Sequence, residues 1–317
     1  MLSTERLSPE QMERATHLLK KGLVVAFPTE TVYGLGAPIF NPSALAEIFR
    51  LKGRPADNPL IVHISDISQI EKIAIDIPDL FYSLAKAFFP GPCTVVLKKH
   101  PSVPAIVSGG MDTIAVRMPS DPIARALIAA VGEPLAAPSA NLSGKPSATT
   151  CDHVLEDFAG KIAAVLDGGR TELGIESTVI SLLHNPPLFL RPGTITKAHL
   201  EEVMGCSMIE AGHSEEKVLS PGMKYRHYCP RTPIGLFHSR EELLSAAARE
   251  ARPMLLTRYA DFPVEKGEHF TLTAKELYAH LRYADVRGYS CILVLCDEIL
   301  LSDHALKNRL FRACGQI

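Results

Sequence analysis

Lys52 and Arg54 are two cations separated by one glycine, and they stand where a helix-like apolar segment gives way to a proline-punctuated turn. The turn leads directly into an apolar run, 60–64, that carries His63. Lysine offers a compact positive charge and arginine a forked set of donors, the groups that phosphate and carboxylate ligands require. A turn held between a helix and a buried strand keeps such side chains in place. The pattern predicts a polyanion site, although cations at a helix end also complement the helix dipole.

Further segments carry hydroxyl groups or cations beside expected strands. The segment 29–36 is rich in hydroxyl groups and has two glycines at the exit of an apolar run, where α/β sheets place ligand contacts. Thr113 and Arg117 lie four residues apart on an expected strand, so both side chains project to one face. Hydroxyls and an arginine also border the strands around 176–180 and 188–193. Each segment has a plainer interpretation as a turn or a solvated sheet face.

The segment 139–147 is a proline-limited loop with three serines, an asparagine and a lysine, a dense set of donors for phosphate. It is not a P-loop. The Walker spacing needs a glycine at Ser139, and Pro146 stands where a serine or threonine would bind magnesium. A nucleotide bound by this loop is therefore held in another way.

Helices and strands alternate along the first two hundred residues and must position these segments. Ser8-Pro9 and Asn41-Pro42 are typical of helix starts, where a capping side chain precedes a proline. Apolar runs such as 23–27 and 60–64 predict strands, about seven in all. The alternation predicts an α/β fold, with one open sheet flanked by helices, as a domain over residues 1–206.

Residues 207–230 change character and are interpreted as a linker. The polar stretch from Glu210 has no clear period. It ends in the basic, aromatic motif Ser220-Pro221-Gly222-Met223-Lys224-Tyr225-Arg226-His227-Tyr228, which predicts a segment that docks as a lid over a ligand or as a strap between domains. Residues 231–317 alternate short apolar runs with helical stretches and predict a smaller, Rossmann-like α/β domain. Because it has no GxGxxG motif, nucleotide binding is not inferred for this domain.

The composition is that of an ordinary globular protein, with 46% hydrophobic and 21% charged residues among 317. Its net charge of −2 gives no support to a strong nonspecific binder of nucleic acid. The 7 cysteines are scattered without a CxxC pair, so neither a disulfide framework nor a zinc site is suggested. The sequence shows neither a membrane-length apolar stretch nor a secretion signal, so no membrane association and a cytoplasmic location are expected.

Several separated motifs together resemble a known family. Lys52-Gly53-Arg54 with Ser139-Ala140-Asn141 is similar to the KxR and SxN signature of the YrdC-type domain. The supporting motifs occur in the family's order, and they are Pro28 to Leu35, Asn58-Pro59-Leu60, Glu176-Ser177-Thr178 and Arg191-Pro192-Gly193. The motif from Ser220 to Tyr228, with the domain that follows it, resembles the two-domain version of the L-threonylcarbamoyladenylate synthase family.

The resemblance implies a YrdC-like twisted open sheet and a nucleotidyltransferase activity. Such an enzyme joins L-threonine, bicarbonate or CO2, and ATP to give threonylcarbamoyl-AMP and pyrophosphate. A separate transferase complex then uses this product for the N6-threonylcarbamoyladenosine (t6A) modification of tRNA position 37, with any contact to tRNA itself transient. Mg²⁺ is expected on the ATP triphosphate, although the sequence shows no dedicated carboxylate cage for it.

Carried over by position, the family's binding residues form two sets. The set assigned to ATP is Arg54, Asn58, Thr113, Ser139, Asn141, Ser147 and Arg191, with Tyr225 from the linker motif. The set assigned to threonine is Thr31, Tyr33, His63, Arg117, Ala137 and Ser177. Lys52 and Arg54 are expected to act in catalysis by supplying charge to phosphate, because this chemistry needs positioning and charge stabilisation rather than a protein nucleophile. No residue is assigned to a metal.

Two other functions use the same residues. An RNA-binding protein would present the cations of the basic turn and its neighbours to a tRNA or duplex backbone, but the near-neutral charge and the absence of RNA-stacking motifs argue against it. A carbamoyl transferase would use a related pocket on another acceptor. Dependence of ATP consumption on threonine separates the three.

Overall fold

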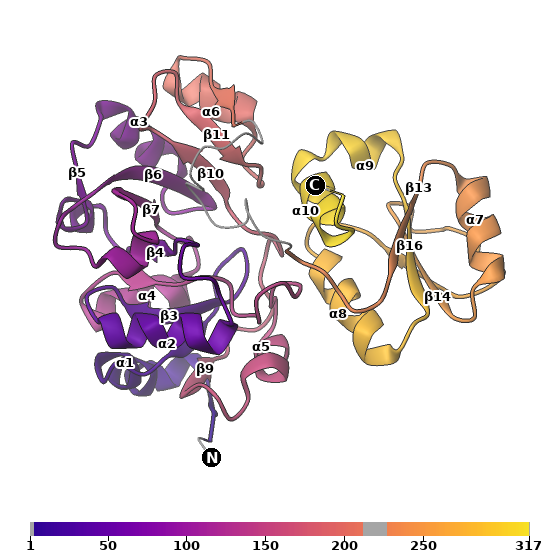
Figure 1. The fold of residues 1–317 in the computed structure, drawn as a ribbon, viewed down its shortest axis with the longest axis horizontal. Coiled ribbons are helices and arrows are strands. Elements are labelled where there is room, and N and C mark those ends of the chain that lie inside the picture. The colour runs from indigo at the N-terminus through magenta and orange to yellow at the C-terminus, as the bar shows by residue number, and fades with distance from the viewer. Residues whose placement is uncertain (1–2, 212–226, 317) are drawn as a thin grey trace. The chain divides into compact units, whose positions relative to one another are not determined.

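The computed structural model describes residues 3–211 and 227–316, so Tyr225 and most of the linker motif lie outside the described residues. The described chain divides into two compact units, each with a sheet of its own (Figure 1). The first unit contains 3–143, 148–172 and 176–211, and the second contains 144–147, 173–175 and 227–316.

Both units include residues of the expected linker, 207–230: the first unit extends to 211, and the second includes 227–230. Residues 209–210 form a short strand that pairs with 188–189 in the first unit, and 227–230 belongs to the second. A strand of two residues has no periodic pattern, so the sequence did not indicate it. The lid or strap role of the linker motif stays a prediction.

The sheet of the first unit is mixed and has 12 strands among the described residues, more than the roughly seven that the apolar runs predicted. Its order is β1 (Glu5–Leu7), β9 (Ala164–Leu166), β2 (Val25–Phe27), β3 (Gly34–Pro38), β8 (Leu135–Ala136), β4 (Ile61–His63), β7 (Thr113–Arg117), β6 (Cys93–Lys99), β10 (Thr178–Ser181), β11 (Leu188–Arg191) and β12 (Ile209–Glu210), with β5 (Ala74–Ile75) paired to β6. The strands that were missed are mostly two or three residues long, too short for alternation to be read.

The helices of the first unit are α1 (Met12–Lys20), α2 (Pro42–Lys52), α3 (Asp79–Phe88), α4 (Pro122–Val131), α5 (Cys151–Phe158) and α6 (Lys197–Met204). The boundaries of α2 follow from its sequence. The Asn41 side chain accepts a hydrogen bond from the backbone N–H of Ala44 at 3.1 Å, and Gly53 ends the helix with a φ of 59°, the left-handed conformation that glycine favours. Lys52 is therefore the last helical residue, and Arg54 begins the turn.

The two faces of this sheet are covered differently. On one face α2, α3, α5 and α6 contribute to a large apolar core, and α3 packs against α6 (Figure 1). On the other face α1 and α4 cover the end of the sheet that contains β1, β9, β2 and β8.

The remaining half of that second face carries a small apolar strip. Its buried members are Ile61, Val96, Ala115 and Val179, which come from β4, β6, β7 and β10, and no helix residue in the described chain belongs to it. Side chains two residues along a strand share a face, so Thr113 and Arg117 lie on the same face as Ala115, and His63 on the same face as Ile61. Thr113, Arg117 and His63, three of the expected site residues, therefore lie on the face that carries this strip.

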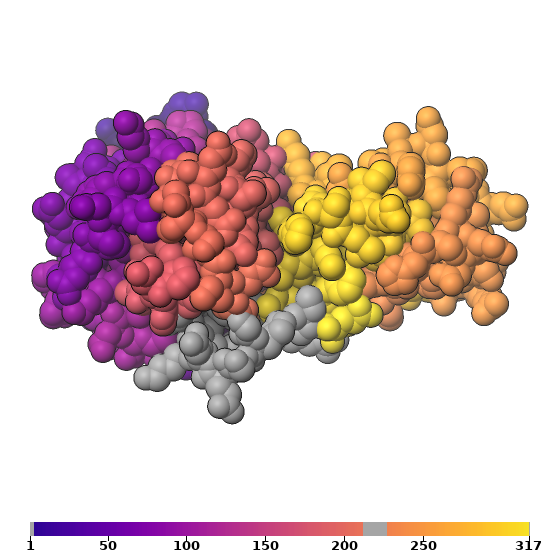
Figure 2. Space-filling model, turned by 90° about the horizontal axis from the view of Figure 1, so that it is seen from above, coloured from indigo at the N-terminus to yellow at the C-terminus, as the bar shows by residue number. Residues whose placement is uncertain are grey.

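The second unit has a four-stranded parallel sheet in the order β13 (Ile234–Phe237), β16 (Cys291–Leu295), β14 (Pro253–Thr257) and β15 (Glu268–Thr271). Its helices are α7 (Arg240–Arg249), α8 (Leu277–Arg287), α9 (Glu298–Ser302) and α10 (His304–Ala313). Figure 2 shows these residues, orange to yellow, packed into one continuous body. The sheet confirms the expected small α/β domain.

Two short segments from earlier in the chain complete the second unit. The buried Arg282 guanidinium donates from Nη2 to the carbonyl of Pro146 at 2.7 Å. Gly174 has a φ of +74°, and a Cβ at this position would lie 2.4 Å from the carbonyl oxygen of Lys275, so only glycine fits there. Among the helices that the structure describes, none has the length and apolar character needed to cross a membrane.

Candidate active site

Lys52 ties the end of α2 to the loop that carries the second signature motif. Lys52 is 3% exposed, and its ammonium donates to the backbone carbonyls of Ser139 and Asn141. The backbone N–H of Ser143 donates in turn to the carbonyl of Lys52 at 2.9 Å. We expected this ammonium to supply charge to phosphate, and that role stays a prediction; the two contacts described above tie it to the loop. The two motifs, with Lys52 and Ser139 87 residues apart in sequence, are thus one structural element.

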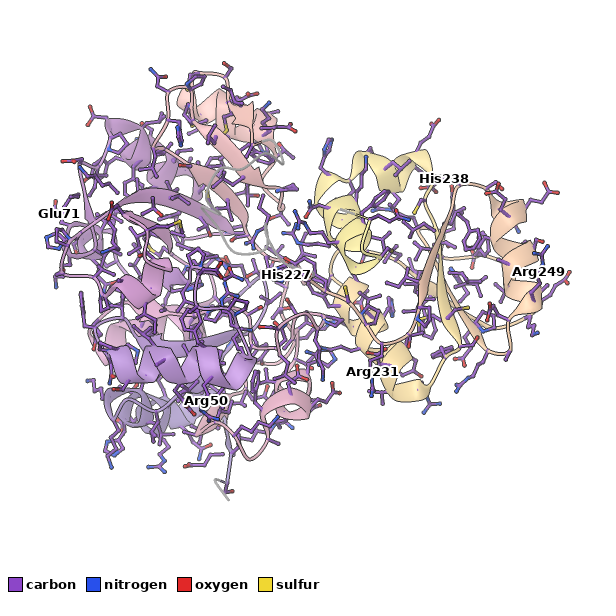
Figure 3. All side chains as sticks on the ribbon, viewed as in Figure 1. Arg50, Glu71, His227, Arg231, His238 and Arg249 are labelled. Atoms are coloured by element: carbon purple, nitrogen blue, oxygen red, sulfur yellow. The ribbon has the colours of Figure 1, made fainter. Side chains whose placement is uncertain are left out.

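Arg50, two residues before Lys52 on α2, shows how a solvated cation of this helix is placed. It projects from α2 (Figure 3) and forms two hydrogen bonds with Glu47, at 2.7 and 2.6 Å, near the surface. Its side chain is 69% exposed. The plain helix-end interpretation therefore applies to Arg50 and not to Lys52.

The turn after Gly53 folds around the guanidinium of Arg54. Its Nη2 donates to the Asn58 side-chain oxygen and to the Pro59 carbonyl, both at 2.7 Å, and its Nε donates to the Asn58 carbonyl at 3.1 Å. Arg54 and Asn58, both assigned to ATP, are therefore in direct contact. The turn immediately precedes β4 and fixes the plane of the guanidinium, as bidentate recognition of an anion requires.

Arg117 and Thr31, two residues of the threonine set, are also in contact. Arg117 is 4% exposed, and its Nη1 donates to the Thr31 hydroxyl at 2.8 Å. Its Nε donates to the carbonyl of Gly91 at 3.2 Å, and its Nη2 lies 2.7 Å from a carboxylate oxygen of Glu30. Two segments far apart in the sequence, 30–31 and the one with Gly91, thus meet the buried guanidinium of a third.

His63 lies beside Arg117, because the two are partners in the parallel pairing of β4 and β7. The ring is 3% exposed, and its Nδ1 has no hydrogen-bond partner among the described residues. Burial, and after it the positive charge of Arg117, lower the pKa of His63 to about 3. The imidazole is therefore neutral near pH 7, a polar group without charge at the edge of the strip.

This neutral histidine predicts a pH dependence of stability. Between pH 6.5, the ordinary pKa, and about 3, the unfolded chain binds a proton that the folded chain does not, so the free energy of unfolding falls as the pH falls. We expect His63 to account for a loss of about 2 kcal/mol between pH 6.5 and pH 5. Urea unfolding of the wild type and of His63→Gln at pH 7, 6 and 5 measures this loss. If the free energy of unfolding falls equally with pH in the two proteins, the prediction is wrong.

Arg191 joins the two predicted sets. It was assigned to ATP, yet its Nη2 donates to the carbonyl and hydroxyl of Ser177, of the threonine set, at 3.0 and 3.3 Å. The Ser177 hydroxyl is also 2.7 Å from that of Thr94 on β6. Arg191 is 5% exposed, and it pairs with Val179 of the apolar strip across β10 and β11. The ATP and threonine sets therefore share a boundary at Arg191 and Ser177.

The other members of the two sets are less closely tied to these groups. Thr113 begins β7, and Ala137 is bonded through its backbone N–H to Ile61. The Tyr33 hydroxyl donates to the carbonyl of Gly169 at 2.7 Å, so its polar end is directed to that turn. Asn141 donates to the carbonyl of Leu142 at 2.9 Å. Ser147 is fully buried and belongs to the second unit, so its role in ATP binding stays a prediction.

Sequence reasoning missed Glu30 and Thr94, which the structure places against Arg117 and Ser177. Glu30 stands between two threonines in a segment that was recognised as a ligand loop. A buried arginine needs a charge partner, so a carboxylate in that segment was the available signal. Thr94 is a hydroxyl inside an apolar strand, which is by itself a common occurrence.

Two known families match the chain, one over each part of it. Residues 17–193 match the Sua5/YciO/YrdC family, whose description is "Telomere recombination", and residues 195–315 match "Threonylcarbamoyl-AMP synthase, C-terminal domain". The chain belongs to the two-domain branch of the YrdC-type family. The resemblance of the signature motifs is thereby confirmed.

Relatives of known name span nearly the whole chain. "Threonylcarbamoyl-AMP synthase" of Bacillus subtilis is 48% identical over 98% of this chain and 96% of its own length, and that of Pyrococcus abyssi is 42% identical over the same shares. The crystal structure of P. abyssi Sua5 complexed with L-threonine aligns with a TM-score of 0.90 at 40% identity, covering 100% of this chain and 97% of that one. The YrdC-like fold and the small second domain are therefore those of the family.

Proposed function

We propose that this protein is an L-threonylcarbamoyladenylate synthase, which forms threonylcarbamoyl-AMP and pyrophosphate from L-threonine, bicarbonate or CO2, and ATP. The observation that carries the proposal is the shared boundary at Arg191 and Ser177, where residues assigned to the nucleotide touch residues assigned to the amino acid. The relatives named threonylcarbamoyl-AMP synthase, one of them solved with L-threonine, support it. The protein is an enzyme of the nucleotidyltransferase type.

The chemistry suits a site made of cations, hydroxyls and amides. The amine of threonine captures CO2 as a carbamate, a carbamate oxygen attacks the α-phosphorus of ATP, and pyrophosphate leaves. Each step needs orientation and stabilisation of negative charge rather than a protein nucleophile. In this scheme Arg117 binds the carboxylate of threonine, with Thr31, His63, Ala137 and Ser177 around it. The phosphates lie toward Arg54, Asn58, Thr113 and the loop that Lys52 holds.

Magnesium enters this scheme with the nucleotide. Within the described residues, no three or more His, Cys, Asp or Glu side chains gather as metal ligands. Triphosphate-bound Mg²⁺ takes its ligands largely from phosphate and water, so such a gathering is not required. We further propose that the product passes to a tRNA threonylcarbamoyl-transferase complex for t6A formation in the cytoplasm, with at most a transient contact to tRNA.

Of the five cations that an RNA-binding function would use, Arg54 and Lys145 are partly or fully exposed and the other three are buried. Lys52, Arg117 and Arg191 are each 5% exposed or less and are bonded to internal carbonyls, hydroxyls or a carboxylate. Side chains held in this way cannot contact a phosphate backbone on the surface. A small, enclosed ligand is the better fit.

The reaction is tested with purified protein, ATP labelled in the α-phosphate, L-threonine and bicarbonate. We expect a labelled adduct with the mass of threonylcarbamoyl-AMP and an equal amount of pyrophosphate, and both should disappear when threonine or bicarbonate is omitted. Replacing threonine with other amino acids tests the carbamoyl-transferase alternative. The proposal would be contradicted if pyrophosphate were released at the same rate without threonine. It would also be contradicted by micromolar, salt-dependent RNA binding without any ATP consumption.

A further inference from the structure

We propose that Glu30 is a positioning residue for threonine binding, acting through Arg117. The inference rests on the proposed function and adds to it a residue that belongs to neither binding set. Glu30 and Arg117 are each 4% exposed, and Glu30 Oε1 lies 2.7 Å from Arg117 Nη2. Two opposite charges at this distance, both removed from water, interact far more strongly than a surface pair.

Among the described residues, Glu30 is the ionic partner of one corner of the Arg117 guanidinium. The Nε and Nη1 corners donate to the carbonyl of Gly91 and to the hydroxyl of Thr31. The Nη2 corner has no aligned hydrogen bond among the described residues, so its contact with Glu30 is an ion pair. Without the carboxylate, nothing described here would hold that corner, and the guanidinium could rotate about the two remaining contacts.

The charge on Glu30 is maintained in this buried place. Burial alone would raise the pKa of its carboxyl, but the positive charge of Arg117, with the nearby backbone N–H of Ser120, outweighs burial and leaves the pKa below its ordinary value. The pair is therefore a carboxylate and a guanidinium near pH 7, with no net charge. A neutral pocket suits threonine, which arrives as a zwitterion, and it leaves N–H donors of Arg117 for the substrate carboxylate.

Glu30 and Thr31 reach Arg117 from one loop, between β2 and β3. The loop that provides a threonine-binding hydroxyl thus also sets the direction of the guanidinium. Because one loop holds both, the positions of the Thr31 hydroxyl and the Arg117 guanidinium depend on each other. Glu30 therefore affects recognition of the amino acid rather than of the nucleotide.

The test separates the Michaelis constants for the two substrates. Glu30→Gln keeps the shape of the side chain and removes its charge, and we expect the KM for threonine to rise about tenfold or more while the KM for ATP stays within about twofold. Glu30→Asp keeps a carboxylate and should recover part of the loss. Glu47→Gln, which removes the partner of Arg50 on the surface, is the matched control and should match the wild type.

A double-mutant cycle with Arg117→Lys shows whether Glu30 acts through Arg117. Once Arg117 is replaced, Glu30→Gln should add little to the KM for threonine. Equal increases in both KM values, additive effects, or a Glu30→Asp variant no better than Glu30→Gln would overturn the inference. If the melting curve shows that Glu30→Gln does not fold, the inference is tested with Glu30→Asp and with the double-mutant cycle of Glu30→Asp and Arg117→Lys. A wild type that forms no adduct would instead refute the proposed function, whereas an active wild type matched by Glu30→Gln would refute only this inference.

Discussion

Lys52→Met is expected to lower the rate of threonylcarbamoyl-AMP formation about 100-fold or more and to destabilise the protein. Methionine keeps most of the apolar stem and removes the ammonium, so the carbonyls of Ser139 and Asn141 lose a charged donor inside the protein. Each buried group left without a partner costs ~1–3 kcal/mol. The loop that carries the second signature motif would then be free to move, and misplacement of a positioning loop is costly to catalysis.

The control for Lys52→Met lies on the same helix. Arg50→Met removes an exposed cation that is paired with Glu47 at the surface, so we expect activity within about twofold of the wild type and a change in stability below ~1 kcal/mol. Adduct formation and urea unfolding are measured for both variants. A stable Lys52→Met protein with full activity would show that the loop does not depend on this ammonium.

Arg191→Lys is expected to reduce kcat/KM about 100-fold and to raise the KM for both substrates. Lysine keeps the charge but lacks the fork with which Arg191 donates from Nε and Nη2 to the carbonyl of Ser177. Because Arg191 touches a residue of the threonine set while belonging to the ATP set, its loss should disturb both subsites. This outcome differs from that of Glu30→Gln, which affects threonine alone.

Ser177→Ala provides the matched comparison for Arg191→Lys. It removes the hydroxyl that meets Arg191 and Thr94 but retains the backbone carbonyl, so we expect a smaller effect, about tenfold, mainly on the KM for threonine. Steady-state kinetics with each substrate varied in turn measure both variants. An Arg191→Lys enzyme that changes only the KM for ATP would show that the two subsites are not joined at this residue.

Sequence reasoning located the parts of the fold whose signals are local. Asn41-Pro42 marked the start of α2, the Lys52-Gly53-Arg54 motif its end, and the apolar run before His63 the strand β4. It did not find β3, Gly34–Pro38, because a strand with two glycines lacks alternation and is formed by its neighbours β2 and β8. Helix α5 was missed for a related reason, since it follows a loop that was interpreted only for its polar groups.

The candidate site shows the same difference between local signals and contacts of distant segments. Residue identities could be carried over from the resemblance, and the pairs Arg54 with Asn58 and Thr31 with Arg117 are in contact. What a sequence does not show is which groups face each other across the sheet. The use of Lys52 as a link between motifs and the pairing of Glu30 with Arg117 both depend on contacts between distant segments.

The most direct test of the central claim is a crystal structure of the protein with L-threonine and a non-hydrolysable ATP analogue bound together. We predict the carboxylate of threonine within hydrogen-bonding distance of Arg117, beside Thr31 and Ser177, and the phosphates of the nucleotide toward Arg54 and Arg191 on the half-sheet that carries the apolar strip. Threonine bound away from Arg117, or a nucleotide bound wholly within residues 231–317, would contradict the account.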